Sequence, residues 1–438
     1  MKRSILGLVL ILLFVISSCK KDDNSIDPIN ADYTDETVEE SKTNVENNAI
    51  SLLDKVEDLE QATAIEVLMH MVELPPPTEL KSTSSGTVLK PLAMLQSINN
   101  ENVTPSGIFS MMKSTAEAYE DPVSFMQIWD SLVGKYTYNF QTGEYDETPL
   151  ADKIVIEFPG KEGDITNTAS ITVDNFGVFK ITDPIADWPE DIAPELPSSI
   201  SVDLKYNNIS IAGFSFSGSY QSDGMPTRIT STMTLDDFSF VLDITHSPYT
   251  EASIRETFKY QEQILIEIYA KANGNWSEDN IEANADDGDF QEIINNANAH
   301  FIFMNIEVAG KVNIKALADK MMALDEQYDN ELITDEAYTD ASVAAINDNV
   351  DLVVVYLNEN KKIAEVEAYK YIDSWTYMGT TYYDYWIDMR MVYNDGSKVD
   401  METYFNNELN NFYDELNDFI AHLNDKYDMG IDPIEPSN

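Results

Sequence analysis

The sequence predicts an α+β protein with an N-terminal helical segment, an antiparallel β-meander and a C-terminal mixed α+β region that ends in a long helix. Two periodicities support this prediction. Apolar residues recur three or four positions apart from Val45 to Val72 and from Phe405 to Leu423, as on one face of a helix. Between residues 199 and 246 they alternate every second position, as on one face of a sheet. An apolar content of 43% in 438 residues is enough for folded cores, which excludes a largely disordered chain.

The amino terminus has the pattern of an export signal. Lys2 and Arg3 precede an apolar run from Ile5 to Ile16, which is too short for a permanent membrane span. The run ends in Ile16-Ser17-Ser18-Cys19, which resembles the lipobox of bacterial lipoproteins. This resemblance implies that residues 1–18 are a signal peptide removed before Cys19. It also implies that acyl chains on the Cys19 thiol attach the protein to a membrane.

Residues 19–37 are predicted to be the lipidated cysteine and a flexible acidic tether, rich in Asp, Asn, Ser and Pro. The segment Lys20-Lys21-Asp22-Asp23 resembles the short lysine-then-acidic export signal of surface lipoproteins in the Bacteroidetes phylum. The resemblance implies attachment to the outer membrane. Whether the protein faces the cell exterior or the periplasm is left open.

Residues 38–133 are predicted to be helical. One continuous helix is expected through Val45–Val72, ended by the prolines at 75–77, with shorter helices near 88–98 and 106–133.

Residues 134–299 are predicted to form the antiparallel sheet region. A two-residue turn at Asn207-Asn208 would pair Tyr206 with Ile209 and Leu204 with Ile211, all four facing one buried side. A change of phase near Gly213 indicates a bulge. Residues 252–272 fit either a strand or a helix.

Residues 300–438 are predicted to be the C-terminal α+β region. The helices are expected at 314–327 and 335–347, before a final long helix capped near Asp400. The strands are expected at 300–308, 352–356, 363–371 and 382–392, with a hairpin turn at residues 394–396.

The charge balance limits the classes of partner. With 78 acidic and 27 basic residues, the formal net charge of -51 repels the phosphates of nucleic acids and anionic lipid head groups. The single cysteine lies in the export signal, which excludes an internal disulfide and a thiolate metal site.

Catalytic motifs are not evident. The segment Gly213 to Gly218 superficially resembles a nucleophile elbow, but its spacing is wrong and a strand pattern surrounds it. No glycine-rich phosphate-binding motif is present, and carboxylates are too frequent for a glycosidase pair to be identified. The sequence therefore favours a protein that is not an enzyme.

A weak calcium site is one interpretation of the acidic loop that contains Asp286, Asp287 and Asp289. Gly288 does not lie where an EF-hand loop requires a glycine. A solvated acidic loop is the favoured interpretation, and no cofactor is expected.

Aromatic and charged residues alternate near residue 385. On a strand, one face would carry Tyr382, Asp384, Trp386, Asp388 and Arg390, and the other Tyr383, Tyr385, Ile387, Met389 and Met391. The first face would suit stacking on sugar rings or docking of a partner protein. We expect instead a sheet covered on both sides by the flanking helices.

These observations predict a non-enzymatic, lipid-anchored outer-membrane or cell-surface lipoprotein. Its partner would be another envelope protein or a small, lipidic or glycan ligand, and not a nucleic acid. The alternative is a lipoprotein that binds or cleaves glycans, which an exposed Trp386 beside a carboxylate would favour.

Cys19→Ala should abolish membrane retention, because the acyl chains contribute about 0.8 kcal/mol per buried methylene and no other anchor is predicted. The measurement is partitioning of the protein into detergent. Unchanged partitioning of the Cys19→Ala protein would contradict the predicted lipid anchor.

Overall fold

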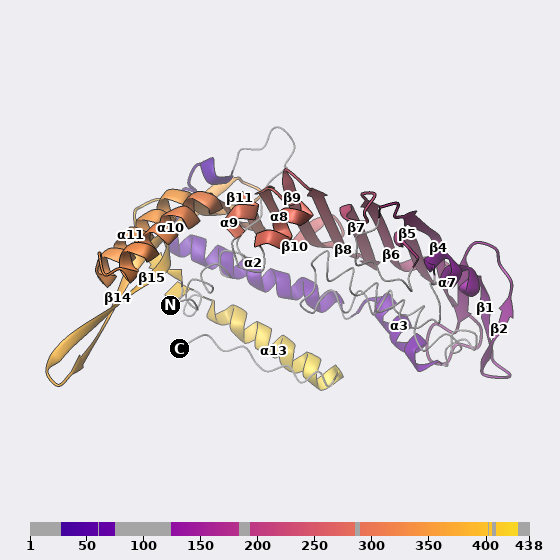
Figure 1. Ribbon diagram of the computed structural model, residues 1–438. Helices are drawn as coiled ribbons and strands as arrows, with labels where there is room; N and C mark the ends of the chain where they lie inside the picture. Colours follow the sequence, from indigo (N-terminus) through magenta and orange to yellow (C-terminus); the bar gives the residue numbers. More distant parts are fainter. Residues whose placement is uncertain are drawn as a thin grey trace. The chain divides into compact units, whose positions relative to one another are not determined.

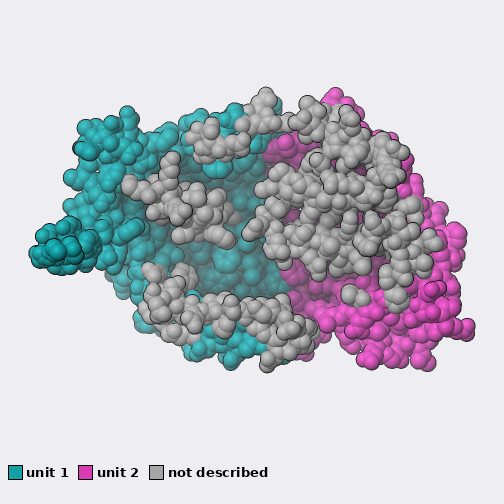
Figure 2. All heavy atoms as spheres, turned by 60° about the horizontal axis from the view of Figure 1, so that its bottom comes forward, with its two compact units in different colours: residues 1–58, 247–438 teal, residues 59–246 magenta. Residues whose placement is uncertain are grey.

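The computed structural model describes residues 28–59, 61–74, 124–183, 193–284, 290–401, 403–404 and 409–427. The chain forms two compact units: unit 1 contains residues 1–58 and 247–438, and unit 2 contains residues 59–246 (Figure 2). The described residues include sixteen strands, eight in each unit, together with helices. The predicted mixture of helices and mainly antiparallel strands is confirmed, and the strands dominate.

Unit 2 is built on an antiparallel meander. The strand order is β2-β1-β3-β4-β5-β6-β7-β8, and β1 and β3 are parallel. The strands are β1 (Gly134–Asn139), β2 (Glu144–Thr148), β3 (Ile154–Phe158), β4 (Ala169–Lys180), β5 (Glu195–Tyr206), β6 (Ile209–Tyr220), β7 (Pro226–Leu235) and β8 (Phe238–Ser247).

Two helices complete the described part of unit 2, α3 (Thr63–Glu73) and α7 (Phe125–Leu132). Their residues Val67 and Trp129 belong to the same core cluster as the alternating strand residues Ile154, Ile156 and Phe158. The carboxylate of Asp236, in the turn between β7 and β8, accepts a hydrogen bond from the Ala64 backbone N–H at 2.9 Å. This bond satisfies one of the free N–H groups at the start of α3.

The hairpin of β5 and β6 confirms the predicted turn. Asn207 and Asn208 both have positive φ, 51° and 65°, and Tyr206 pairs with Ile209. A bulge then pairs Leu204 with Ala212, so the predicted Leu204–Ile211 pair is wrong. Ile209 is 68% exposed because it follows the turn at the end of the strand, whereas Leu204 and Ile211 are buried.

Other sequence predictions need correction. The expected single helix is two helices, α2 (Val38–Leu59) and α3, since Ala62 has an extended backbone. The expected strand at 300–308 covers the end of one strand and the start of the next. Residues 252–272 are strands, as described below. The helix expected near 88–98 lies outside the described residues, as does most of the segment 106–133.

Unit 1 contains a second antiparallel meander, in the order β9-β10-β11-β12-β13-β14-β15-β16. Its strands are β9 (Glu251–Tyr260), β10 (Gln263–Gly274), β11 (Ile294–Phe303), β12 (Ile306–Val312), β13 (Val350–Tyr356), β14 (Lys361–Tyr377), β15 (Thr380–Tyr393) and β16 (Lys398–Asp400).

The helices of unit 1 are η1 (Pro28–Asn30), α2, α8 (Glu278–Asn284), α9 (Phe290–Ile293), α10 (Ile314–Asp329), α11 (Asp335–Asn349) and α13 (Asn410–Tyr427). The helices predicted at 314–327 and 335–347 are therefore confirmed. Asp400 accepts a hydrogen bond from the Thr403 N–H at 2.9 Å, as a cap does. The final long helix α13, however, begins only at Asn410, so the prediction that this helix is capped near Asp400 is wrong. Within the described residues, no helix is both long enough and apolar enough to span a membrane.

The sheet of unit 1 is covered on both faces near β13. Leu352, Val354 and Tyr356 pack in one cluster with Val45 of α2, whereas Val353 and Val355 pack with Ile29 of η1. Because successive side chains of a strand point to opposite faces, α2 and η1 lie on opposite sides of this sheet.

Strands β14 and β15 extend beyond their neighbours. β13 pairs with β14 only as far as Glu365, and β16 pairs with β15 only from Arg390 to Val392. Residues 371–387 thus form a two-stranded hairpin, which we call the arm, and Figure 1 shows it leaving the rest of unit 1.

Leu204→Ala should lower the free energy of unfolding of unit 2 by about 2–5 kcal/mol, because Leu204 is 3% exposed in the core. Lys205→Ala should change it by no more than about 0.5 kcal/mol, because the half-exposed Lys205 side chain lies outside the core and forms an ion pair with the half-exposed Asp203. Urea denaturation of both variants checks the difference. Equal shifts of the midpoint would contradict the observed burial.

Candidate functional site: the exposed aromatic arm

The arm carries many of the exposed apolar side chains in the described part of the chain. Among the described residues, seventeen large apolar side chains are exposed, and eight of them lie in the arm: Tyr371, Ile372, Trp375, Tyr377, Met378, Tyr382, Tyr383 and Trp386. Every residue from 371 to 384 is exposed. Contiguous exposed apolar surface of this kind is typical of interaction sites.

The register of the arm arranges one of its faces in rows. Trp375 pairs with Tyr382, which we call the outer aromatic pair, and Tyr371 pairs with Trp386, the inner aromatic pair. Between them Asp373 pairs with Asp384, which we call the acidic row. All six side chains share one face because they are two positions apart along each strand.

The outer aromatic pair is preorganised. The rings of Trp375 and Tyr382 are stacked, with centroids 4.6 Å apart and planes inclined by 16°. The Trp375 Nε1–H donates a hydrogen bond to Asp384 Oδ2 at 3.2 Å, which connects the outer aromatic pair to the acidic row.

The structure divides the predicted ligand face into two parts. Tyr382, Asp384 and Trp386 are exposed on the arm, and Trp386 retains 53% of its accessible surface. Asp388 and Arg390 lie at the base of the hairpin and are partly buried. The expectation that helices cover this sheet on both sides is wrong here, because the arm extends past the strands and helices that cover β13.

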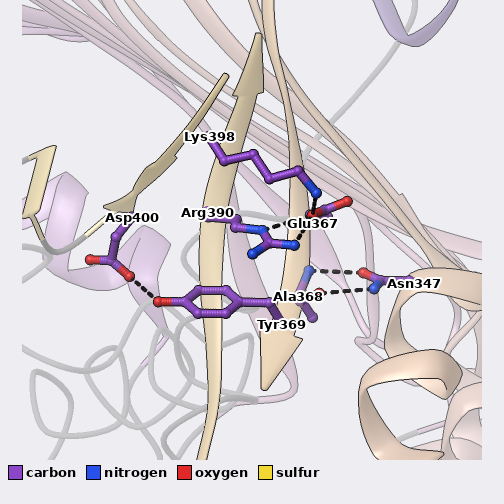
Figure 3. A network of polar contacts seen from close by, with 7 residues as sticks. All are labelled: Asn347, Glu367, Ala368, Tyr369, Arg390, Lys398 and Asp400. Carbon is purple, nitrogen blue, oxygen red and sulfur yellow. Dashed lines mark hydrogen bonds and ion pairs between the residues drawn. The ribbon is translucent and has the colours of Figure 1, made fainter. Parts of the chain in front are cut away.

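An ion cluster holds the base of the arm on this same face. Glu367 Oε1 accepts hydrogen bonds from Arg390 Nε and from Lys398 Nζ, both at 2.7 Å (Figure 3). These two cations therefore join β14, β15 and β16. The hydrogen bond from Lys398, followed by that from Arg390, lowers the pKa of Glu367.

Tyr369 extends this base. Its hydroxyl donates a hydrogen bond to Asp400 Oδ2 at 2.5 Å, and the Arg390 guanidinium lies 4.6 Å from the centroid of its ring (Figure 3). Burial, together with the bond to Asp400, raises the pKa of Tyr369. The phenol therefore stays protonated and keeps its hydrogen bond at physiological pH.

Where β13 no longer pairs with β14, a side chain of α11 forms hydrogen bonds with the backbone of β14. Asn347, near the end of α11, accepts the Ala368 N–H at 2.8 Å and donates to the Ala368 carbonyl at 2.9 Å (Figure 3). The side-chain amide thus replaces a neighbouring strand at one residue. Two positions further along the chain, Lys370 forms ion pairs with Glu336 and Asp340 of α11, at 3.0 and 2.8 Å.

A second polar cluster lies inside unit 1. His300 on β11 is placed between Glu267 on β10 and Glu307 on β12, with nitrogen–oxygen distances of 2.9 and 3.1 Å. Arg255 and Thr257 also donate to Glu267, each at 2.9 Å. Burial raises the pKa of Glu267, but the bonds from His300, Arg255 and Thr257 reverse this effect and leave it lowered. All three residues on β10–β12 are buried, which favours a structural role for this cluster.

The remaining candidate residues lie outside the described part of the chain. They are the lipidation and export residues Cys19 to Asp23 and the weak calcium candidates Asp286, Asp287 and Asp289. Within the described residues, no three His, Cys, Asp or Glu side chains are grouped as a metal site requires.

The sequence pattern does not place Tyr371 or Trp375 on the predicted ligand face, although Trp375 belongs to the same aromatic-rich segment. The available signal was the turn at residues 377–380. Met378 and Gly379 both have positive φ there, 49° and 82°, so the two strands join directly. A Met-Gly turn is less distinctive than Asn-Gly, and the length of the hairpin therefore remained hidden.

The chain matches no protein-family model, and no curated protein or solved structure shows significant similarity to it.

The ion cluster at the base of the arm should contribute less to stability in acid. Because the folded-state pKa of Glu367 is lowered, its contribution to stability is complete above the unfolded-state pKa and is lost as the pH falls through the folded-state pKa. The melting temperature of the wild type should therefore fall more than that of Glu367→Gln between about pH 6 and pH 3. The exposed Glu262→Gln is the control and should follow the wild type. Parallel curves for all three proteins would contradict the role of Glu367.

Proposed function

We propose that this protein is a lipid-anchored envelope protein, held on the outer membrane through Cys19, that binds a partner protein through the arm. The observation that carries the proposal is the gathering of eight exposed large apolar side chains on one two-stranded hairpin. We propose a binding protein and not an enzyme, because no catalytic motif is evident in the sequence.

Residues of the arm have the composition of binding hot spots. Trp and Tyr are enriched among the side chains that contribute most to protein interfaces, because they bury a large area at a small cost in side-chain entropy. Such rings are exposed on both faces of the hairpin. Trp386 and Tyr383 are three positions apart on one strand, so their side chains point to opposite faces. A protein partner that covers both faces would bury both sets of rings.

The base of the arm supports the same proposal. The Glu367 cluster, the Tyr369–Asp400 bond and the Asn347 amide hold the strands where they leave the sheet. A preorganised site loses less conformational entropy on binding than a loop does. The exposed rings are therefore presented in one arrangement.

The place where the chain joins the fold is also favourable, and it lies before the end of the predicted tether, residues 19–37. Tyr33 forms a bridge with Lys362, and the Lys362 N–H donates to the Asp32 carbonyl at 2.8 Å, so the start of the described chain is tied to the first residues of β14. β14 has 17 residues and spans roughly 55 Å. The far end of β14, where the arm turns, is thus held away from the point at which the tether enters the fold.

Glycan binding is the second candidate. The exposed Trp386 and the carboxylate of Asp384 share one face, and aromatic rings beside carboxylates stack on sugar rings. Against this candidate, the stacking of Trp375 on Tyr382 covers one face of each of these rings.

Photo-cross-linking tests the proposal. A photoreactive phenylalanine analogue at Tyr383, in cells that naturally make the protein, should give an adduct with a discrete protein. The same analogue at Tyr249, which is 76% exposed in the turn between β8 and β9, should not give that adduct.

Identical adducts from the two positions would contradict the proposal. Adducts with polysaccharide alone would replace it with the glycan candidate.

A further inference from the structure

The arm carries acidic residues without a basic residue of its own. Residues 371–387 contain Asp373 and Asp384 but no lysine or arginine. The nearest basic residue before them, Lys370, is paired with Glu336 and Asp340. After them, Arg390 is paired with Glu367. The cations at both ends of the arm are therefore engaged by other carboxylates.

Asp373 and Asp384 stand directly opposite each other across the two strands. Like charges in this position destabilise a hairpin. Neither carboxylate forms an ion pair within the described part of the chain. Each has one oxygen engaged, by the Ser374 N–H at 2.7 Å and the Trp375 Nε1–H at 3.2 Å, and its second oxygen accepts no hydrogen bond from the described residues.

The acidic row lies between two aromatic pairs. The outer pair and the inner pair are each two residues away along the strands, which corresponds to about 7 Å. A cation held by the two carboxylates would lie near the ring faces or edges of both pairs. Trp and Tyr attract a cation within about 6 Å of the ring centroid.

From this arrangement we infer that the arm binds a cationic segment of its partner protein, and that an arginine side chain of that segment occupies the acidic row. This inference rests on the proposed function and specifies the chemistry of its partner. The charge of the guanidinium compensates the repulsion between Asp373 and Asp384, and its apolar faces pack against the aromatic pairs.

Arginine fits the row better than lysine. Its planar guanidinium donates in a fork that can engage two carboxylate oxygens, and it stacks on aromatic rings. A lysine ammonium is more strongly hydrated and does not stack as a plane. The net charge of -51 adds long-range attraction for any basic partner, but this attraction does not distinguish the two residues.

The test uses the full chain in detergent and a short peptide in which arginine alternates with glycine, titrated by calorimetry at physiological salt. Asp373→Asn combined with Asp384→Asn should weaken binding by about tenfold. The matched control is Asp329→Asn combined with Asp351→Asn, which removes the same charge from exposed positions outside the arm. The control should weaken binding by no more than about twofold.

Two further peptides test the chemistry. A lysine analogue should bind more weakly than the arginine peptide, and a citrulline analogue, which keeps the shape without the charge, should not bind. The melting temperature of the arm variant should be equal to or higher than that of the wild type, because the substitution removes a repulsion. A loss of binding then cannot be attributed to unfolding.

Equal weakening by the arm variant and the control would overturn the inference, because binding would then depend on the net charge of the protein and not on the acidic row. Unchanged affinity of the arm variant would also overturn it. If the cross-link at Tyr383 to a discrete protein persists in either case, the proposed function stands and only the arginine inference fails. If Tyr383 gives no cross-link to a discrete protein while the arginine peptide binds the wild type and not the arm variant, the proposed function fails and the chemistry of the acidic row stands.

Discussion

The pairing of β14 with β15 is the constraint on which the exposed part of the molecule depends. It holds residues in register from Ala364–Tyr393 to Tyr377–Thr380, far beyond the point where β13 ends. A slip of one residue would move the side chains of one strand to the other face and separate each aromatic ring from its partner. The Glu367 cluster resists such a slip, because Glu367 and Arg390 are themselves a cross-strand pair.

Several of the few basic residues form ion pairs that connect neighbouring strands or helices. Arg390, Lys398 and Lys370 all bind carboxylates at the base of the arm. Arg255 compensates the buried Glu267 together with His300. With 27 basic residues against 78 acidic ones, such assignments leave much of the surface negative. Salt screens the resulting repulsion between exposed carboxylates, whereas the buried cluster is screened much less.

Buried alternating residues and exposed aromatic residues have different roles within unit 1. Near β13 both faces of the sheet are covered, so its Val and Tyr side chains form the core. In the arm the same strand pattern continues without a covering layer, and the rings remain in contact with water. β14 thus runs from the covered core at one end to an exposed aromatic surface at the other.

Local sequence patterns determined the helices at 314–329 and 335–349, the Asn207-Asn208 turn and the two faces of β15, because helical and strand periodicity and turn chemistry are properties of neighbouring residues. They also carry the lipobox resemblance, which lies outside the described residues. Tertiary structure decided the break between α2 and α3, the bulge that pairs Leu204 with Ala212, and above all the exposure of Trp386. An alternating strand has the same pattern whether a helix covers it or not. Only the packing of β13, β16 and α11 against β14 and β15 determines where the covered sheet ends and the arm begins.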